Sequence, residues 1–435
     1  MLENLMDTTA QYLDTAMVGS LGTAATAAVG CTTTVNWLIG SSIAAMGVGF
    51  LSYISKALGA GDRDRAGKAA LQGILMAGIL GIFFTVLTQV LAPFIPVWMR
   101  ADSNIQASAS RYFAILYSTV FFRGVKIIFG TMLRAAGDSR TPMRTGIGMN
   151  LVNLVLNFLF IYPSRTVTLG SLSLRIFGAG WGISGAALAS ALSFAYGGIA
   201  ITFALFRHPI LSPKGRSLRL DRGILIPCLQ IAVPNMLQRF CTSLGYVIFA
   251  SMINSLGELS TASHTIANTV EAAFYIPGYG MQAAVATLTG NCIGAKDGKR
   301  LREISSVASF LEFGMMFVSG GLLFLFAPAL VGLFSKDPEV ISLGGLLLRM
   351  VSVSEPFYGL SVITEGMLQG AGLTKVPFLF NVLCMWGFRI GGTAICLHFL
   401  HLGLPAAWVC MLLNNMSLLL FFRIYWNKKK RSVCE

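Results

Sequence analysis

Twelve long apolar stretches, separated by turn residues and charges, dominate this sequence. An α-helix needs about 20 mainly apolar residues to cross the roughly 30 Å hydrocarbon core of a bilayer. The stretches that reach this length are residues 1–20, 26–55, 68–92, 105–133, 142–162, 181–206, 223–254, 260–293, 304–334, 341–371, 376–400 and 404–426. They predict an all-α polytopic membrane protein with twelve transmembrane helices.

The composition supports this prediction and excludes other classes of protein. Of the 435 residues, 55% are hydrophobic and only 11% are charged, whereas soluble domains carry about 25% charged residues. The chain therefore lacks the charges to cover a water-facing surface, which excludes a soluble enzyme and a disordered protein. The eight cysteines form no C-x-x-C pair and indicate neither a disulfide framework nor a zinc site.

The net charge of +14 is explained by membrane topology, so we expect a lipid bilayer and no nucleic acid as partner. Most Lys and Arg residues lie in the loops that follow even-numbered helices, for example Lys56 to Lys68, and in the tail after residue 426. By the positive-inside rule both termini lie in the cytoplasm. The predicted location is the cell membrane.

An internal duplication appears when the sequence is shifted by 235 positions. This shift matches Ser20-Leu21-Gly22 with Ser255-Leu256-Gly257 and Ala136-Gly137 with Ala371-Gly372. Each copy holds six predicted helices, so the copies share one topology and are related by an axis along the membrane normal. We expect two six-helix bundles around a central cleft: residues 1–206, a basic linker at 207–222, residues 223–426, and a basic tail at 427–435. Residues 223–235 precede the equivalent of Met1 in the second copy, so helix 1 is expected to lack its first turns.

Four segments carry a resemblance to a known family. The segment from Leu13 to Gly22 resembles the first-helix motif of the multidrug and toxic compound extrusion (MATE) family, and residues 135–143, 182–189 and 386–390 resemble later motifs in the same order. The resemblance implies a monomeric antiporter without cofactor that exports small organic, often cationic, compounds in exchange for H⁺ or Na⁺. The pattern is most similar to the DinF-like branch.

Helix 1 carries a polar stripe. At 100° per residue, Glu3, Asp7, Gln11 and Asp14 fall within an arc of about 80°. The stripe either packs against neighbouring helices or lines the cleft. An ionisable group at bilayer depth costs at least ~3 kcal/mol, which favours a function. Asp14 matches the acidic position of the family motif and is the candidate coupling carboxylate, because a carboxyl group there can bind and release a proton. Asp7 is a second cation-coupling candidate, and Gln11 is a substrate-binding candidate.

Helices 5 and 6 supply polar groups for the same predicted site. Asn153 and Asn157 lie one turn apart and match the family's polar pair beside the helix 1 acid, although many members have Asp where this chain has Asn157. Hard cations such as Na⁺ favour anionic oxygen ligands, so the amide favours H⁺ over Na⁺ as the coupling ion. Ser190 either adds a hydroxyl group to this site or is a small packing residue. No metal site is certain.

The candidate substrate-binding residues lie in helices 2 and 8. Glu271 is the lone acid of its segment, and the shift of 235 pairs it with Asn36. Glu271 either attracts a cationic substrate or pairs with a basic residue such as Arg239. Tyr275 either stacks on flat ligands or packs against other helices.

For the other charges at or near bilayer depth, internal ion pairs or snorkelling are as economical an explanation as a role in transport, and we assign them no site. These residues are Glu312, Glu355, Glu365, Arg123, Lys126, Arg349 and Arg389.

Several rival functions are weighed against export. A flippase for lipid-linked sugars, from the same superfamily, predicts extra helices or an arginine-rich cleft. Residues 64–68 mimic a loop of major facilitator transporters, but the rest of that signature is absent. A polytopic membrane enzyme is disfavoured because the four histidines form no H-E-x-x-H motif and no G-x-S-x-G elbow has a usable base. A channel would need a pore ring, which a twofold repeat does not supply.

Overall fold

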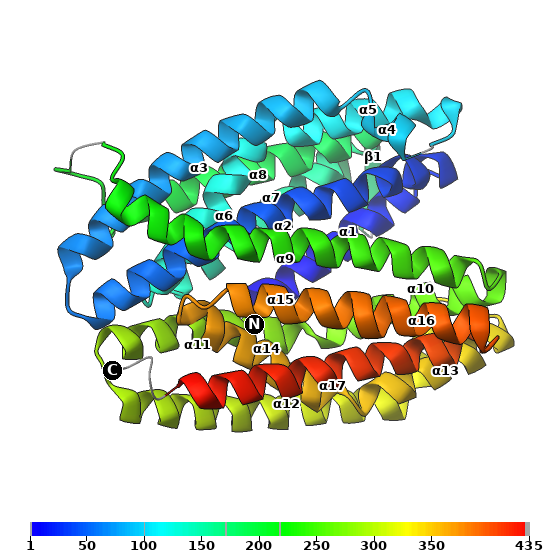
Figure 1. The fold of residues 1–435 in the computed structure, drawn as a ribbon. Helices are drawn as coiled ribbons and strands as arrows, with labels where there is room; N and C mark the ends of the chain where they lie inside the picture. The colour runs from blue at the N-terminus through cyan, green and yellow to red at the C-terminus, as the bar shows by residue number, and fades with distance from the viewer. Residues whose placement is uncertain (1, 100, 170–171, 217–218, 431–435) are drawn as a thin grey trace. The chain divides into compact units, whose positions relative to one another are not determined.

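A computed structural model describes residues 2–99, 101–169, 172–216 and 219–430, and these residues are almost entirely helical. Figure 1 follows the chain from α1 in blue to α17 in red. The helices are α1 (Leu2–Gly19), α2 (Thr23–Gly59), α3 (Arg63–Leu91), α4 (Ile95–Trp98), α5 (Ser103–Tyr117), α6 (Val120–Ala135), α7 (Arg140–Phe160), α8 (Gly182–Arg207), α9 (Arg222–Asn254), α10 (Glu258–Phe274), α11 (Ile276–Gly294), α12 (Gly298–Gly332), α13 (Pro338–Ser352), α14 (Glu355–Gly370), α15 (Lys375–Leu383), α16 (Gly392–Ala394) and α17 (Leu404–Lys429), with π-helical segments η1 (Cys384–Gly391) and η2 (Ile395–Phe399) around α16.

Among the described residues, seven helical segments are long and apolar enough to cross a membrane, and nine are if each bent pair of helices counts as one span. The bent pairs are α5–α6, at 46°, and α13–α14, at 53°. The other three predicted spans fall on α1, α7 and α10–α11, which are not among these nine. The chain is thus a multi-pass helical protein, and the count of twelve spans stays a prediction.

The helix bounds repeat with the shift found in the sequence. Moving α5 and α6 by 235 positions gives the bounds of α13 and α14, and moving α2 gives the start of α10 and the end of α11. The turn between α1 and α2 uses Gly22 at φ 108°, and Gly257 at the equivalent turn has φ 99°. Because only glycine adopts such angles without strain, the duplication fixes the same backbone at both turns.

The described residues divide into two compact units. One, called the N-terminal unit, comprises Leu2–Phe50 and Asp64–Leu225, and the other, the C-terminal unit, comprises Leu51–Arg63 and Ile226–Glu435. In the N-terminal unit α8 packs against α5, α6 and α7, and α1 packs against α7. Met17 and Val18 of α1 are buried with Ile161 and Ala186, which fixes the end of α1 beside α7 and α8.

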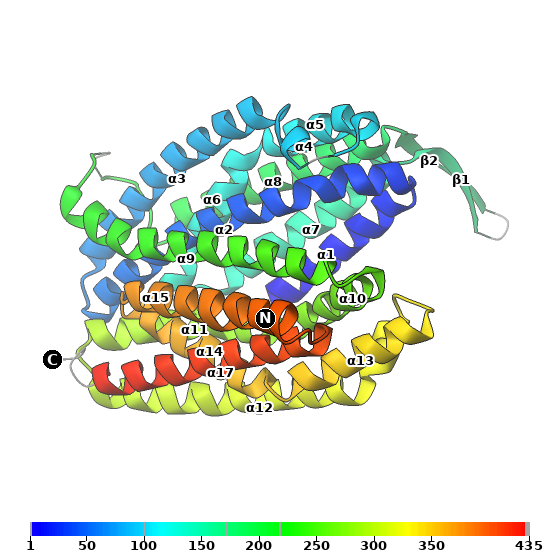
Figure 2. The same ribbon diagram turned by 45° about the vertical axis from the view of Figure 1, so that its right-hand side comes forward.

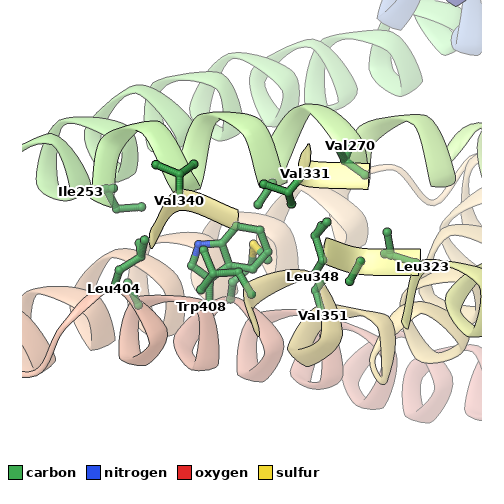
Figure 3. Packing of buried hydrophobic residues seen from close by; sticks show 14 of the residues in the cluster. Ile253, Val270, Leu323, Val331, Val340, Leu348, Val351, Leu404 and Trp408 are labelled. Atoms are coloured by element: carbon green, nitrogen blue, oxygen red, sulfur yellow. The ribbon is translucent and has the colours of Figure 1, made fainter. Parts of the chain in front are cut away.

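The C-terminal unit has its own apolar core. Helix α14 packs against α11, α12 and α17, and α13 packs against α10 and α12. Figure 3 shows Trp408 of α17 surrounded by Leu404, Val340 and Leu348. The indole ring is fully buried, and His264 lies edge-on to it with the ring centres 5.8 Å apart. Close packing of this kind, rather than removal of apolar surface from water, holds helices together in lipid.

The C-terminal end of α2 belongs to the C-terminal unit. Ser52 Oγ donates a hydrogen bond to the carbonyl oxygen of Gly370 at 2.9 Å, and Lys56 Nζ donates to that of Ala371 at 2.8 Å. These carbonyl groups lie at the C-terminal end of α14, where a helix leaves its last carbonyls without internal partners. The end of α2 therefore caps α14.

Helix α12 shows the inverted amphipathicity of a lipid-facing helix. Phe310, Phe317 and Leu325 are largely exposed, whereas Met316 and Leu323 are fully buried. The exposed face carries large apolar groups, which lipid accepts and water would not. This pattern agrees with a membrane-embedded location.

A β-hairpin between α7 and α8 was not predicted from the sequence. Strands β1 (Pro163–Leu169) and β2 (Leu172–Ala179) pair antiparallel, with Thr166 opposite Arg175. Figure 2 shows the hairpin extending away from the end of α7. Its alternating Thr-Val-Thr-Leu pattern is a strand signal of period two inside a segment that we had treated only as a loop.

Candidate functional site

A cavity of about 410 Å³ lies inside the N-terminal unit, and α1, α2, α5, α6, α7 and α8 contribute to its lining. Its volume is within the range of small-molecule sites. Polar residues are concentrated on its walls: Asp14, Asn150, Asn153, Ser190 and Asn36 all line it. A polar cavity among apolar helices is the arrangement expected of a solute-binding site.

Asp14 is held by amide groups. The side-chain amide of Asn157 donates a hydrogen bond to Oδ1 of Asp14. Of the two orientations of the Asn153 amide, the one that satisfies its neighbours places its nitrogen 2.8 Å from Oδ1 of Asp14, and its oxygen then accepts from the Ser190 hydroxyl at 3.1 Å. Asp14, Asn153, Asn157 and Ser190 thus form one hydrogen-bonded cluster.

The local sequence explains how this cluster assembles. Asn153 and Asn157 lie four residues apart and share one face of α7, and both are buried. Helix α1 packs against α7, which brings Asp14 to that face, and the small residues Ala186, Ala187 and Ala189 let α8 approach closely. The structure therefore brings together four of the five predicted cation-coupling residues. The side chains of the fifth, Asp7, and of Gln11 lie outside the described part of the structure.

Asn36 lines the same cavity but contacts other residues. Its side-chain oxygen accepts hydrogen bonds from the Tyr117 hydroxyl, at 2.8 Å, and from the Arg123 guanidinium. Arg123 in turn lies over the ring of Phe194, 5.3 Å from its centre. The predicted substrate-binding residue Asn36 is thus joined to a basic residue that we had not assigned to a site.

Glu271 and Tyr275 belong to the C-terminal unit and are not among the residues that line this cavity. Glu271 is buried, and the Tyr275 hydroxyl donates a hydrogen bond to it. The Tyr275 ring lies 4.4 Å from the ring of Tyr358. Arg389, buried against Tyr246 and Phe249, is the basic residue that acts electrostatically on Glu271.

For Glu312 and Glu355, the described residues show no internal ion pair, which was one of the alternatives for these acids. Glu312 and Glu355 are fully buried, and among the described residues neither carboxyl group has a hydrogen-bond partner. Glu312 fits between two helices because Gly278 and Gly359 have no side chains: a Cβ atom at either glycine would lie 2.9 Å from its Oε1. Packing space, rather than an opposite charge, accommodates this residue.

Sequence reasoning missed the basic wall of the cavity. Arg123 and Lys126 both line it, and they lie three residues apart on α6, which places them on one face. The signal in the sequence is two cations one turn apart within the apolar segment 105–133. Among the side chains that the structure describes, no cluster of three or more His, Cys, Asp or Glu residues is arranged to hold a metal ion.

Lipid-facing helices that enclose a polar cavity define a membrane transporter. The MatE family model matches residues 1–159 and 234–395, and the chain belongs to this family, whose members are transporters and not enzymes. The family resemblance of the sequence motifs is confirmed. The DinF-like branch stays a prediction.

Full-length relatives are similar along nearly the whole chain. A probable multidrug resistance protein NorM of Thermotoga maritima is 26% identical over 98% of this chain and 91% of its own length. A probable multidrug resistance protein YoeA of Bacillus subtilis is 25% identical over 99% and 92%.

Solved structures share the fold. A multidrug resistance MATE family transporter of the MOP superfamily in an outward-facing conformation has a TM-score of 0.88 at 25% identity, covering 100% of this chain and 94% of that chain. MATE in complex with MaD3S has a TM-score of 0.91 at 24% identity, with the same coverage.

Proposed function

We propose that this protein is a secondary active antiporter of the cell membrane that exports small organic, often cationic, compounds in exchange for H⁺. The observation that carries the proposal is the Asp14 cluster: a carboxylate that lines a cavity and is held by the amide of Asn157. The names of the relatives, multidrug resistance proteins, support the cargo class.

In the proposed cycle, movements of the two units open the binding site alternately to the cytoplasm and to the outside. Cargo binds from the cytoplasm while Asp14 is ionised, and a proton from outside later takes the same carboxylate and favours release of the cargo. The empty carrier then returns. For one inward charge, each 100 mV supplies about 2.3 kcal/mol, roughly a fifty-fold gradient of cargo.

The amides around Asp14 favour H⁺ over Na⁺ in this proposal. Asn153 and Asn157 offer neutral oxygens, whereas hard cations favour several anionic ligands. We further propose that the protein is a monomer with both termini in the cytoplasm. Its two domains are residues 1–206 and 223–426, and the DinF-like branch is the proposed subgroup. Among the described lining residues of the cavity, Arg123 is the one arginine, which falls short of the arginine-rich cleft expected of a lipid-sugar flippase.

Efflux from proteoliposomes tests the proposal. Ethidium export is measured with a pH gradient or a Na⁺ gradient imposed separately, and we expect the pH gradient alone to drive it. Asp14→Asn keeps the shape of the side chain and should reduce gradient-driven efflux to background, while Asp102→Asn, which removes an exposed carboxylate at the start of α5, should not. Full efflux by the Asp14 variant would refute the assignment.

A further inference from the structure

The guanidinium group of Arg123 is built into the wall of the cavity. It donates a hydrogen bond to Asn36 and lies over the Phe194 ring. Gly40 of α2 makes room for it, because a Cβ atom there would lie 2.7 Å from Nη2 of Arg123. Three contacts from two other helices thus fix the position of this cation.

None of these contacts neutralises its charge. Asn36 and Phe194 are uncharged, and among the described side chains no carboxylate lies within ion-pair distance of Arg123. An ionisable group without a counter-ion at bilayer depth is costly and marks a functional site. A guanidinium has five N–H donors, and Asn36 occupies only part of them.

The second copy of the duplication shows that the fold does not need a cation at this point. The shift of 235 replaces Asn36, Gly40 and Arg123 by Glu271, Tyr275 and Tyr358. In the C-terminal unit the same three positions are in contact, through the Tyr275 hydrogen bond and the ring pair. None of these three positions is basic in the second copy, where Arg389 acts on Glu271 from η1, so a cation at the position of Arg123 is specific to the N-terminal copy.

We propose that Arg123, with Lys126 beside it on α6, forms a subsite for the carboxylate or other oxyanion group of an amphoteric cargo. The planar guanidinium suits two-point recognition of an oxyanion. Asp14, on the same cavity, takes the ammonium group of that cargo. Such a cargo is still exported in exchange for protons, because a proton and the ammonium group of the cargo compete for Asp14. The inference deepens the proposed function and rests on it for the direction of transport. The preference for an amphoteric over a purely cationic cargo is a binding property and does not depend on transport.

A pair of dyes tests the subsite by equilibrium binding. A rhodamine with a free carboxylate is amphoteric, and its methyl ester is a cation with the same ring system. Binding of each dye to purified protein in lipid nanodiscs is measured by fluorescence anisotropy. We expect the carboxylate dye to bind wild-type protein at least about tenfold more tightly than the ester.

Three variants separate the charge of Arg123 from its packing. Arg123→Gln should bring the ratio of the two affinities to about one while ester binding changes less than about twofold, and Arg123→Lys should give an intermediate ratio. Arg349→Gln, which removes a guanidinium over the ring of Phe324 outside the cavity, should leave the ratio unchanged.

Three results would overturn the subsite. The first two concern the wild type: a ratio of affinities near one, or no binding of either dye. The third is an equal loss of affinity for both dyes in Arg123→Gln. Failure of the proposed function looks different. In that case Asp14→Asn transports both dyes normally, while the binding ratio of the wild type still favours the carboxylate dye.

Discussion

Asp14 has amide groups as its immediate partners, and under the proposed function these neutral neighbours favour H⁺ over Na⁺ as the exchanged ion. The cluster of Asp14, Asn153, Asn157 and Ser190 was predictable, because helical spacing places the two asparagines on one face and the family motif names the acid. The contact of Arg123 with Asn36 was not predictable, since it depends on how α2 and α6 pack and no local pattern encodes that packing. The sequence alone therefore identified Asp14 as a candidate site residue, whereas Arg123 was identified only from the packing of the helices.

Replacing Asn157 by Asp should change the coupling ion. The substitution places a second carboxylate beside Asp14, and two anionic oxygens favour a hard cation such as Na⁺. We expect a Na⁺ gradient alone to begin driving efflux of ethidium in proteoliposomes, with a reduced response to the pH gradient. Asn150→Asp is the matched control, because Asn150 lies on the same helix and lines the same cavity two turns away. An equal Na⁺ response in both variants would contradict the role of position 157.

Helix α14 packs closely against α11 at Gly370, where a side chain would not fit. The start of α14 shows a feature of the fold that the hydropathy pattern did not reveal. The sequence predicted one span at 341–371, and the structure divides it into α13 and α14 at a 53° bend. This bend was not predicted from the sequence, although Pro356 in the first turn of α14 is a signal that a helix begins anew there. The β1–β2 hairpin was missed because its short alternating pattern is weak beside the long apolar segments.

Gly370→Ala should destabilise the protein. A Cβ atom at position 370 would lie 2.1 Å from the carbonyl oxygen of Ala286 in α11, so the helices would have to separate. Overpacking of this kind costs about 1–3 kcal/mol, and thermal unfolding in detergent should show a lower Tm. The control is Gly314→Ala in α12, where no atom lies within 4 Å of the added group and the better helix propensity of alanine applies. A lower Tm for the control, or none for Gly370→Ala, would argue against close packing as the cause.

The loop after α8 should make stability depend on pH. Nδ1 of His208 accepts hydrogen bonds from the backbone N–H groups of Ile210 and Leu211, both at 3.2 Å. Burial lowers the pKa of His208 below its usual 6.5, although the negative charge of Asp138 opposes this. Above pH 6.5 both the folded and unfolded states are neutral at this residue. As the pH falls below 6.5 the unfolded state takes up a proton first, so the folded state loses relative stability.

His208→Asn should remove this dependence. The Asn oxygen can accept the same backbone hydrogen bonds and does not titrate. We expect the Tm of the wild type to fall by about 1–2 °C more than that of the variant between pH 7.5 and 5.5. Equal slopes for the two proteins would show that His208 does not contribute.

The duplication is the feature of the whole molecule that the sequence predicted best, because one register without gaps held over more than a hundred residues and the helix bounds follow it. The division of the chain was less predictable. The predicted first bundle, residues 1–206, includes all of α2, whereas the compact units of the structure group Leu51–Arg63 with the C-terminal unit. Hydropathy cannot reveal this, since α2 is one continuous helix, and only the hydrogen bonds of Ser52 and Lys56 with the end of α14 show it.

Splitting the chain between Lys214 and Gly215 should therefore yield halves that need each other. When the two halves are co-expressed, α2 can still cap α14 through Ser52 and Lys56, so we expect a tag on one half to recover the other and efflux to be restored. The C-terminal half alone leaves the carbonyls of Gly370 and Ala371 without these donors, and limited trypsin digestion should cut it faster than the co-expressed pair. Ser52→Ala with Lys56→Ala in the N-terminal half should lower the recovery of the partner, whereas Ser41→Ala, which removes a bond inside α2, should not. Equal protease resistance of the C-terminal half with and without its partner would show that the end of α2 is dispensable for that unit.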